Sequence, residues 1–274
     1  MNQAFSSEVD AVDALSSSYQ EIRSEIGKVI IGQEEVIKSV LISIFSNGHC
    51  LLVGVPGLAK TLLVQTVAQV LDLTYNRIQF TPDLMPSDII GSEVFSEERS
   101  FKFIKGPIFS NIILADEINR TPPKTQAALL EAMQEKIVTV GGHAHPLPKP
   151  FFVLATQNPI EQEGTYPLPE AQLDRFMFNV LLTYPSFQEE LQVVRNTTSN
   201  AGTSLRKVLN GEQIIFFQQL VRNIPIADNV LEYAVSLAAK TRPNTATATS
   251  EVNKFLSWGA GPRGLLTLVS SAKA

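Results

Sequence analysis

The stretch Gly54-Val55-Pro56-Gly57-Leu58-Ala59-Lys60-Thr61 decides how this chain folds. An apolar run from Cys50 to Val53 precedes it, and an apolar-periodic run from Leu62 to Leu71 follows it. This order of strand, glycine loop and helix turns backbone N–H groups inward around a polyphosphate at a helix N-terminus. In such a loop Lys60 reaches the β- and γ-phosphates, and the Thr61 hydroxyl binds Mg²⁺. The sequence therefore predicts a site for a nucleoside triphosphate.

The alternative to a phosphate loop is an ordinary strand, turn and helix with a chance lysine. The strand and the helix are both in place, which makes this alternative the weaker one. Ala59 stands where the usual pattern has its last glycine, a mild departure because this position leads into the helix. We expect the following residues to contact the nucleotide: Gly54, Val55, Pro56, Gly57, Leu58, Ala59, Lys60, Thr61 and Leu62.

The composition is that of a globular protein. The chain has 274 residues, of which 44% are hydrophobic and 18% charged, enough for one large α/β domain and a smaller one. The formal net charge is −5, so the whole chain lacks the basic footprint of a nucleic-acid-binding protein. The net charge does not exclude a local basic stripe.

Cysteine usage and the chain start bear on the compartment. The one cysteine, Cys50, excludes an internal disulfide framework and fits a reducing compartment, where we expect it to be a buried structural thiol. Glu8, Asp10 and Asp13 are unlike the start of a signal peptide. No apolar run reaches the ~18 residues of a membrane span. These features predict a cytoplasmic protein without a membrane span.

Strands and helices are expected to alternate through most of the chain. The alternation predicts a parallel sheet with helices on both faces. We expect strands at 50–53, 75–80, 111–115, 151–155 and 176–182, and helices at 12–26, 34–45, 62–71 and 121–134.

Two segments interrupt this alternation, at about 90–105 and 136–148. The first holds short alternating runs around the polar turn 96–100, and the second holds Ile137 to Val140, Gly141-Gly142 and a His-rich return. Both patterns predict hairpins that project from the core. Insertions of this kind are where function varies on a shared scaffold.

We expect three regions: an N-terminal helix (1–28), an α/β nucleotide-binding domain (29–185) and an α-helical second domain (186–274). Helical patterns in the last region cover 187–196, 214–223 and 229–241, with a Thr/Ala-rich loop at 243–250. The final run, 265–274, is helical and has no stop signal after it. We therefore expect a helical domain that is cut short, although a ragged natural end would give the same pattern.

The pair Asp116-Glu117 follows the apolar run Ile112 to Ala115. Ligands bind at the carboxyl ends of strands in parallel sheets, so Asp116 is a candidate ligand of Mg²⁺ and Glu117 a candidate to polarise the attacking water. In isolation such a pair is as often a helix cap or a surface feature. Its place on a strand beyond a phosphate loop favours the catalytic alternative.

Four further polar residues are candidates for the same site. Asn158 could orient the water at the γ-phosphate, or it could be a turn residue before Pro159. Arg175 could be an arginine finger for a neighbouring subunit, or a solvated partner of a nearby carboxylate. Arg263 could touch the nucleotide from the helical domain. Arg120 could bridge subunits or be a loop arginine.

The histidines give little indication of a metal site. His143 and His145 form a His-x-His pair, but a metal site needs more ligands nearby. We expect an exposed polar turn there, and no evident role for His49.

Several of these stretches together resemble the MoxR family of AAA+ ATPases. The most specific one is Glu-Gly-Thr-Tyr-Pro-Leu-Pro-Glu-Ala-Gln-Leu-Asp-Arg-Phe at 163–176, and the resemblance covers nearly the whole chain from about Ile30 onward. The other stretches are Gly54 to Thr61, Ala-Asp-Glu-Ile-Asn-Arg at 115–120, Ala-Thr-Gln-Asn-Pro at 155–159 and Gly-Pro-Arg at 261–263.

The resemblance implies a P-loop α/β fold with a five-stranded sheet in the order 5-1-4-3-2 and an α-helical lid. It implies ATP and Mg²⁺ as ligands, with Ile30, Ile31 and Gly32 packing on adenine. It assigns Asn158 to sensor one, Arg175 to the finger and Arg263 to sensor two.

The resemblance also implies partners. It implies a homo-oligomeric ring, usually a hexamer, with ATP between subunits. It further implies chaperone-like action on a protein client, often alongside a protein with a von Willebrand factor A domain. Gly261 departs from the family pattern, in which serine is more common at that position.

Two rival functions stay open on the sequence. A DNA-acting AAA+ motor would need a basic hairpin, yet Glu93, Glu97 and Glu98 offset the basic residues of the first hairpin. A non-hydrolysing, ATP-gated binding module is the second rival, and the intact Glu117 argues against it. ATP hydrolysis that drives remodelling of a protein client is the preferred hypothesis.

Overall fold

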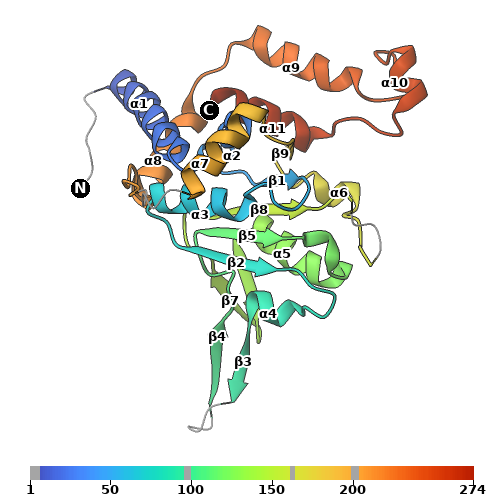
Figure 1. Ribbon diagram of the computed structural model, residues 1–274. Coiled ribbons are helices and arrows are strands. Elements are labelled where there is room, and N and C mark those ends of the chain that lie inside the picture. Colours follow the sequence, from blue (N-terminus) through green and yellow to red (C-terminus); the bar gives the residue numbers. More distant parts are fainter. Residues whose placement is uncertain (1–6, 96–99, 161–163, 199–203) are drawn as a thin grey trace.

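The computed structural model describes residues 7–95, 100–160, 164–198 and 204–274. Its centre is a parallel five-stranded sheet in the order β2-β5-β8-β1-β9 (Figure 1). Counted along the chain, these core strands stand in the order 5-1-4-3-2, so the predicted fold is confirmed. The strands are β1 (Cys50–Val53), β2 (Tyr75–Gln79), β5 (Ile112–Asp116), β8 (Phe152–Gln157) and β9 (Phe178–Leu181).

The central strands are apolar at nearly every position because helices cover both faces of the sheet. Every residue of β5 is buried, and so are the first five residues of β8. Side chains alternate between two cores. Ile112, Leu114 and Leu154 belong to one core, while Ile113, Val153 and Ala155 belong to the other.

The helices divide between these two cores. The first core takes α1 (Glu8–Gly27), α2 (Glu34–Phe45), α3 (Lys60–Val70) and α8 (Gly211–Asn223). The second takes α4 (Pro86–Ile90), the 3₁₀ turn η1 (Ile118–Arg120) and α5 (Pro123–Glu135). The remaining helices are α6 (Glu170–Leu173), α7 (Phe187–Thr198), α9 (Asp228–Lys240), α10 (Ser250–Phe255) and α11 (Pro262–Lys273). Among the described residues, no helix combines the length and apolar character that a membrane crossing needs.

Three short helices were missed by the sequence reasoning: α4, α6 and α10. The first turn of α4 carries Pro86, and the Asp88 carboxylate accepts a hydrogen bond from the backbone N–H of Met85 (2.9 Å). Thr249 caps α10 by accepting from the backbone N–H of Val252 (3.3 Å). The expected loop at 243–250 therefore overlaps the first residue of α10, Ser250. Helices this short lack the repeated apolar spacing on which the prediction rested.

The two predicted hairpins are present and project together from one end of the sheet domain (Figure 1). The first pairs β3 (Gly91–Phe95) with β4 (Phe101–Lys105), and the second pairs β6 (Ile137–Val140) with β7 (His143–Pro146). Most of the predicted turn of the first hairpin, 96–99, lies outside the described residues.

Contacts of Phe103 and Glu93 pack the described parts of the hairpins against each other. The ring of Phe103 on β4 stacks on the ring of His145 on β7, with centroids 4.0 Å apart. The Glu93 carboxylate on β3 lies against Gly141, so close that a Cβ there would meet it at 2.2 Å. His145 is therefore part of a contact between hairpins rather than of the exposed turn predicted for it.

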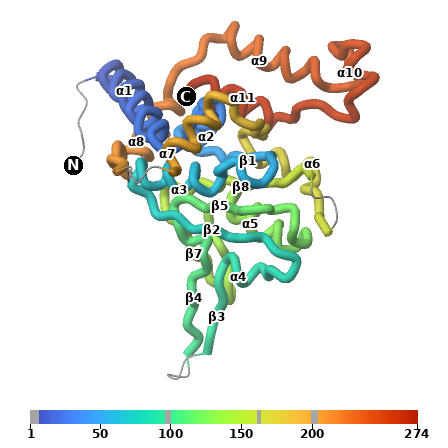
Figure 2. Tube along the Cα trace, viewed as in Figure 1, coloured from blue at the N-terminus to red at the C-terminus, as the bar shows by residue number. Residues whose placement is uncertain are grey.

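The C-terminal helices lie at the opposite end of the molecule from the hairpins (Figure 2). α8 joins them to the sheet domain, because Phe217 packs edge-on against Phe45 of α2, with ring centroids 6.4 Å apart. The Gln218 amide also donates to the Ile44 carbonyl (2.7 Å). α9 and α10 extend away from this junction (Figure 2).

His49 is buried where β1 begins, at the end of the sheet away from the phosphate loop. Its Nδ1 accepts a hydrogen bond from the backbone N–H of Val153 (3.0 Å), so the proton of the neutral ring sits on Nε2. Nε2 lies 3.2 Å from the Met133 carbonyl and 2.8 Å from Lys136 Nζ. Because Nε2–H is a donor, Lys136 can accept from it only as a neutral amine. Burial lowers the pKa of Lys136 to about 8.

Lys136→Met should remove a pH dependence of stability. The ordinary pKa of 10.5 applies in the unfolded chain, so between about pH 8 and 10.5 the unfolded state binds more protons at this residue. The free energy of unfolding should therefore rise with pH in that window, by on the order of 3 kcal/mol at most. Urea unfolding across this range measures it, with Lys124→Met on α5, the helix that Lys136 follows, as the control. Parallel pH curves for the parent and Lys136→Met would contradict this assignment.

Candidate functional site

The phosphate loop lies between β1 and α3, and its backbone takes conformations that few residues adopt. Gly57 has φ +89° and Ala59 has φ +53°, both in the left-handed region. Gly54 has a different constraint, since a Cβ there would lie 2.8 Å from the Cβ of Leu182. The loop therefore needs glycine at 54 for close approach and at 57 for backbone freedom.

Lys60 begins α3 and folds back over the loop. Its Nζ donates to the Gly54 carbonyl (2.7 Å), which spans the loop from its last turn to its first residue. Partial burial lowers the pKa of Lys60, and the charges of Asp116 and Glu117 oppose this shift. The lysine and both carboxylates thus belong to one electrostatic site. Thr61 follows Lys60 on the same turn.

A cavity of about 510 Å³ opens beside the loop, lined by the 29–33 segment, the loop itself and α7. Ile30, Ile31 and Leu62 give it apolar walls suited to a planar base. The Gln33 side-chain amide donates to the Leu58 carbonyl (3.1 Å) and ties the 29–33 segment to the phosphate loop. Gly32 does not line this cavity; it lies against the Glu189 carboxylate of α7.

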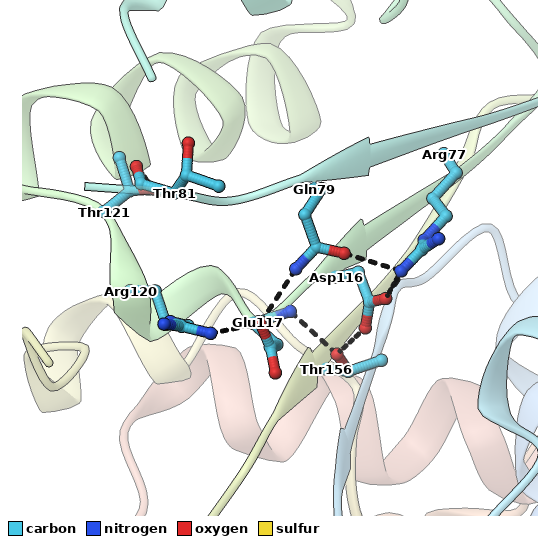
Figure 3. A network of polar contacts seen from close by, with 8 residues as sticks. All are labelled: Arg77, Gln79, Thr81, Asp116, Glu117, Arg120, Thr121 and Thr156. Atoms are coloured by element: carbon cyan, nitrogen blue, oxygen red, sulfur yellow. Dashed lines mark hydrogen bonds and ion pairs between the residues drawn. The ribbon is translucent and has the colours of Figure 1, made fainter. Parts of the chain in front are cut away.

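Asp116 ends β5 and has both carboxylate oxygens engaged (Figure 3). Oδ2 accepts from Nη2 and Nε of Arg77 on β2, at 2.6 and 3.1 Å. Oδ1 accepts from the hydroxyl of Thr156 on β8 (2.6 Å). Neighbouring strands on either side therefore fix the orientation of this buried carboxylate.

Glu117 turns out of the strand in a left-handed conformation, with φ 59° and ψ 49°. Its Oε2 accepts from the Gln79 amide (2.8 Å) and from Arg120 Nη1 (3.1 Å). Its backbone N–H donates to the Thr156 hydroxyl (2.9 Å) (Figure 3). Within the single chain, Arg120 thus pairs with Glu117, a contact that neither alternative for Arg120 had named.

The other candidates differ in burial and in the contacts that they make in the single chain. Asn158 is buried just beyond β8, and its Oδ1 accepts from the backbone N–H of Ile160 (3.1 Å), as in the turn alternative. Arg175 does not reach the phosphate loop of its own chain; it donates to the Leu130 carbonyl of α5. Arg263 is exposed on the first turn of α11.

The residues present fit a magnesium ion bound together with a triphosphate. The Thr61 hydroxyl and the Asp116 carboxylate are oxygen donors, which Mg²⁺ prefers, and the ion takes its other ligands from phosphate and water. Across the described parts of the chain, no group of three or more His, Cys, Asp or Glu side chains is placed to hold a metal by itself.

Comparison with known proteins agrees with this geometry. The model of the ATPase family associated with various cellular activities (AAA) matches residues 49–178. Protein MoxR of Methylorubrum extorquens is 30% identical over 268 residues, which cover 91% of this chain and 77% of that protein. This chain belongs to the MoxR family of AAA+ ATPases.

Two further relatives are more similar to this MoxR-family chain. Chaperone MoxR1 of Mycobacterium tuberculosis is 42% identical over 251 residues, which cover 91% of this chain and about two thirds (66%) of that protein. A crystal structure from Cytophaga hutchinsonii, named as a candidate ATPase, has 43% identity and a TM-score of 0.84, covering 96% of this chain and 82% of that one.

Three residues of this MoxR-family site were missed by the sequence reasoning: Arg77, Gln79 and Thr156. Arg77 and Gln79 are two apart on β2 and so lie on the same face of the strand, where their side chains meet, Arg77 Nη2 donating to Gln79 Oε1 (2.6 Å). That spacing was a usable signal. Thr156 stood inside the quoted stretch 155–159, but its hydroxyl has a role only because β5 lies beside β8.

Gly57→Ala should destabilise the protein and weaken nucleotide binding. The new methyl group meets no atom within 4 Å, so the cost comes from the backbone conformation at φ +89° alone. That cost is about 1–2 kcal/mol for a non-glycine residue. Gly261→Ala is the matched control, because Gly261 has φ −80° and equally open space. Urea unfolding compares the two; equal losses of stability would contradict the conformational role of Gly57.

Proposed function

We propose that this chain hydrolyses ATP between the subunits of a homo-oligomeric ring and uses the reaction to remodel a protein client. The observation that carries the proposal is the convergence of Lys60, Asp116 and Glu117 at the carboxyl edge of the sheet. The two carboxylates act on the lysine charge, and β1 and β5 bring all three there from separate parts of the chain. A switch that only binds nucleotide would not need Glu117.

Each residue has one task in this proposal. The loop N–H groups and Lys60 hold the phosphates and offset their charge. Bound at Thr61 and Asp116, Mg²⁺ would neutralise further phosphate charge. Glu117, positioned by Gln79 and Arg120, orients and polarises the attacking water, with Asn158 as the second polar group.

Arg175 supports the assembly part of the proposal. In the single chain its guanidinium donates to the Leu130 carbonyl of α5, an arrangement that agrees with a role at the site of a neighbouring subunit. Its guanidinium would stabilise charge at that neighbour's γ-phosphate. Arg263 would contact the nucleotide from the helical lid. A ring, with a hexamer as the expected form, provides both geometries.

The proposals for the client and the partner rest on similarity to a relative and on the position of the hairpins. The similarity to Chaperone MoxR1 favours chaperone-like action on proteins. The two joined hairpins project from the sheet domain, and their projecting position suits them to reach a client (Figure 1). A von Willebrand factor A domain protein is the proposed partner, and the cytoplasm is the location predicted from the single cysteine.

Glu117→Gln should keep ATP binding and abolish turnover. The amide retains the size and the hydrogen bond to Arg120 or Gln79 but cannot polarise water as a carboxylate does. A fluorescent ATP analogue measures binding, and phosphate release measures turnover. Turnover equal to that of the parent would overturn the role of Glu117, and absence of binding in the parent itself would overturn the ATPase proposal.

Arg175→Ala should lose hydrolysis as a homo-oligomer, and mixing it with Glu117→Gln subunits should restore part of it. In mixed rings some sites combine an intact Glu117 with the Arg175 of the neighbouring Glu117→Gln subunit. Arginine fingers contribute about 10³–10⁵ in rate, so even a few repaired sites are measurable. Phosphate release from mixtures at several ratios tests this. If the mixtures release no more phosphate than the two variants do separately, the proposal of a site shared between subunits is wrong.

A further inference from the structure

Thr156 contacts both members of the acidic pair, Asp116 and Glu117, through a single side-chain atom. Its hydroxyl donates to Asp116 Oδ1 (2.6 Å) and accepts from the backbone N–H of Glu117 (2.9 Å). Thr156 is fully buried, with an exposed fraction of 0%. A hydroxyl is the smallest side-chain group that donates and accepts at once, so this position calls for serine or threonine.

The bond to Glu117 compensates for an unfavourable backbone. Glu117 takes φ 59°, a conformation that costs an ordinary residue about 1–2 kcal/mol. Its N–H points toward Thr156 on β8, and it would be an unpaired donor in the interior without that hydroxyl. The turn that sends the Glu117 side chain out of β5 therefore depends on a side chain of the neighbouring strand.

The hydrogen bond from Thr156 holds the Asp116 carboxylate from the side opposite Arg77. Arg77 holds Oδ2 from β2, the edge strand, with a side chain that is 47% exposed. Thr156 holds Oδ1 from β8, in the interior. Removing Thr156 would leave the orientation of Asp116 to an arginine in contact with solvent.

We propose that Thr156 is a positioning residue for ATP hydrolysis: its hydroxyl sets the metal-binding carboxylate of Asp116 and the catalytic turn at Glu117 together. The inference rests on the proposed ATPase function. Thr156 also stands two positions before Asn158, which lies just beyond the end of β8.

The test compares variants that differ by one hydroxyl. Thr156→Val removes both hydrogen bonds at almost constant volume, and Thr156→Ser keeps them. Thr121→Val is the matched control: Thr121 is also fully buried, and its hydroxyl donates to the Thr81 carbonyl (2.8 Å) without contacting either acid (Figure 3). All three variants are assembled from the full chain, and thermal unfolding records their stability.

Thr156→Val should lower kcat about 10–100-fold with little change in KM, the range seen when partners that orient metal ligands are lost. Thr156→Ser should restore kcat, and Thr121→Val should retain it. A second measurement is independent of turnover. In the Glu117→Gln background, Thr156→Val should reduce by about tenfold the gain in ATP-analogue affinity that Mg²⁺ gives over EDTA.

Failures of the two proposals are distinguishable. A parent protein that neither binds nor hydrolyses ATP overturns the ATPase function itself. An active parent with Thr156→Val as active as Thr121→Val, or with an unchanged Mg²⁺ gain, overturns the role of Thr156. If Thr156→Val does not fold, Thr156→Ala and Thr156→Ser replace it, since they differ in the hydroxyl alone; equal kcat for that pair overturns the inference.

Discussion

Burial of the parallel sheet on both faces is the constraint from which the site follows. β5 and β8 are closed off by helices on each side, so polar side chains along them would lack water and partners. They are tolerated where the strands end. In a parallel sheet all the carboxyl ends lie along one edge. Lys60, Asp116, Glu117 and Asn158 therefore gather there although the chain separates them widely.

At that edge the polar side chains of β2, β5 and β8 hydrogen-bond to one another in a network that crosses the three strands. The ion pair of Arg77 with Asp116 is partly exposed, so its contribution to stability is small. Its effect is on orientation, as is that of the Gln79 amide on Glu117. A polar network in which each member has partners holds its side chains in one arrangement, which a site for water and phosphate requires.

The order of the strands in the sheet was predicted from the family resemblance and is confirmed. The positions of the phosphate loop and of the acidic pair could be predicted locally, since each motif contains both a strand and the polar residues that follow it. The partners of the acids were not predicted, because the contacts of Arg77, Gln79 and Thr156 cross from one strand to another. The packing of His145 on Phe103 was missed for the same reason: it joins two hairpins that are separate in the sequence.

The union of the two hairpins has a mechanical consequence. One hairpin is rooted beside α4 and the other at the end of α5, and the Phe103–His145 stack joins them farther out. Two hairpins that are attached separately to the core and packed against each other bend less easily than a single hairpin. A small rotation of α5 would therefore displace both pairs of strands together, and by more at a distance from α5 than beside it.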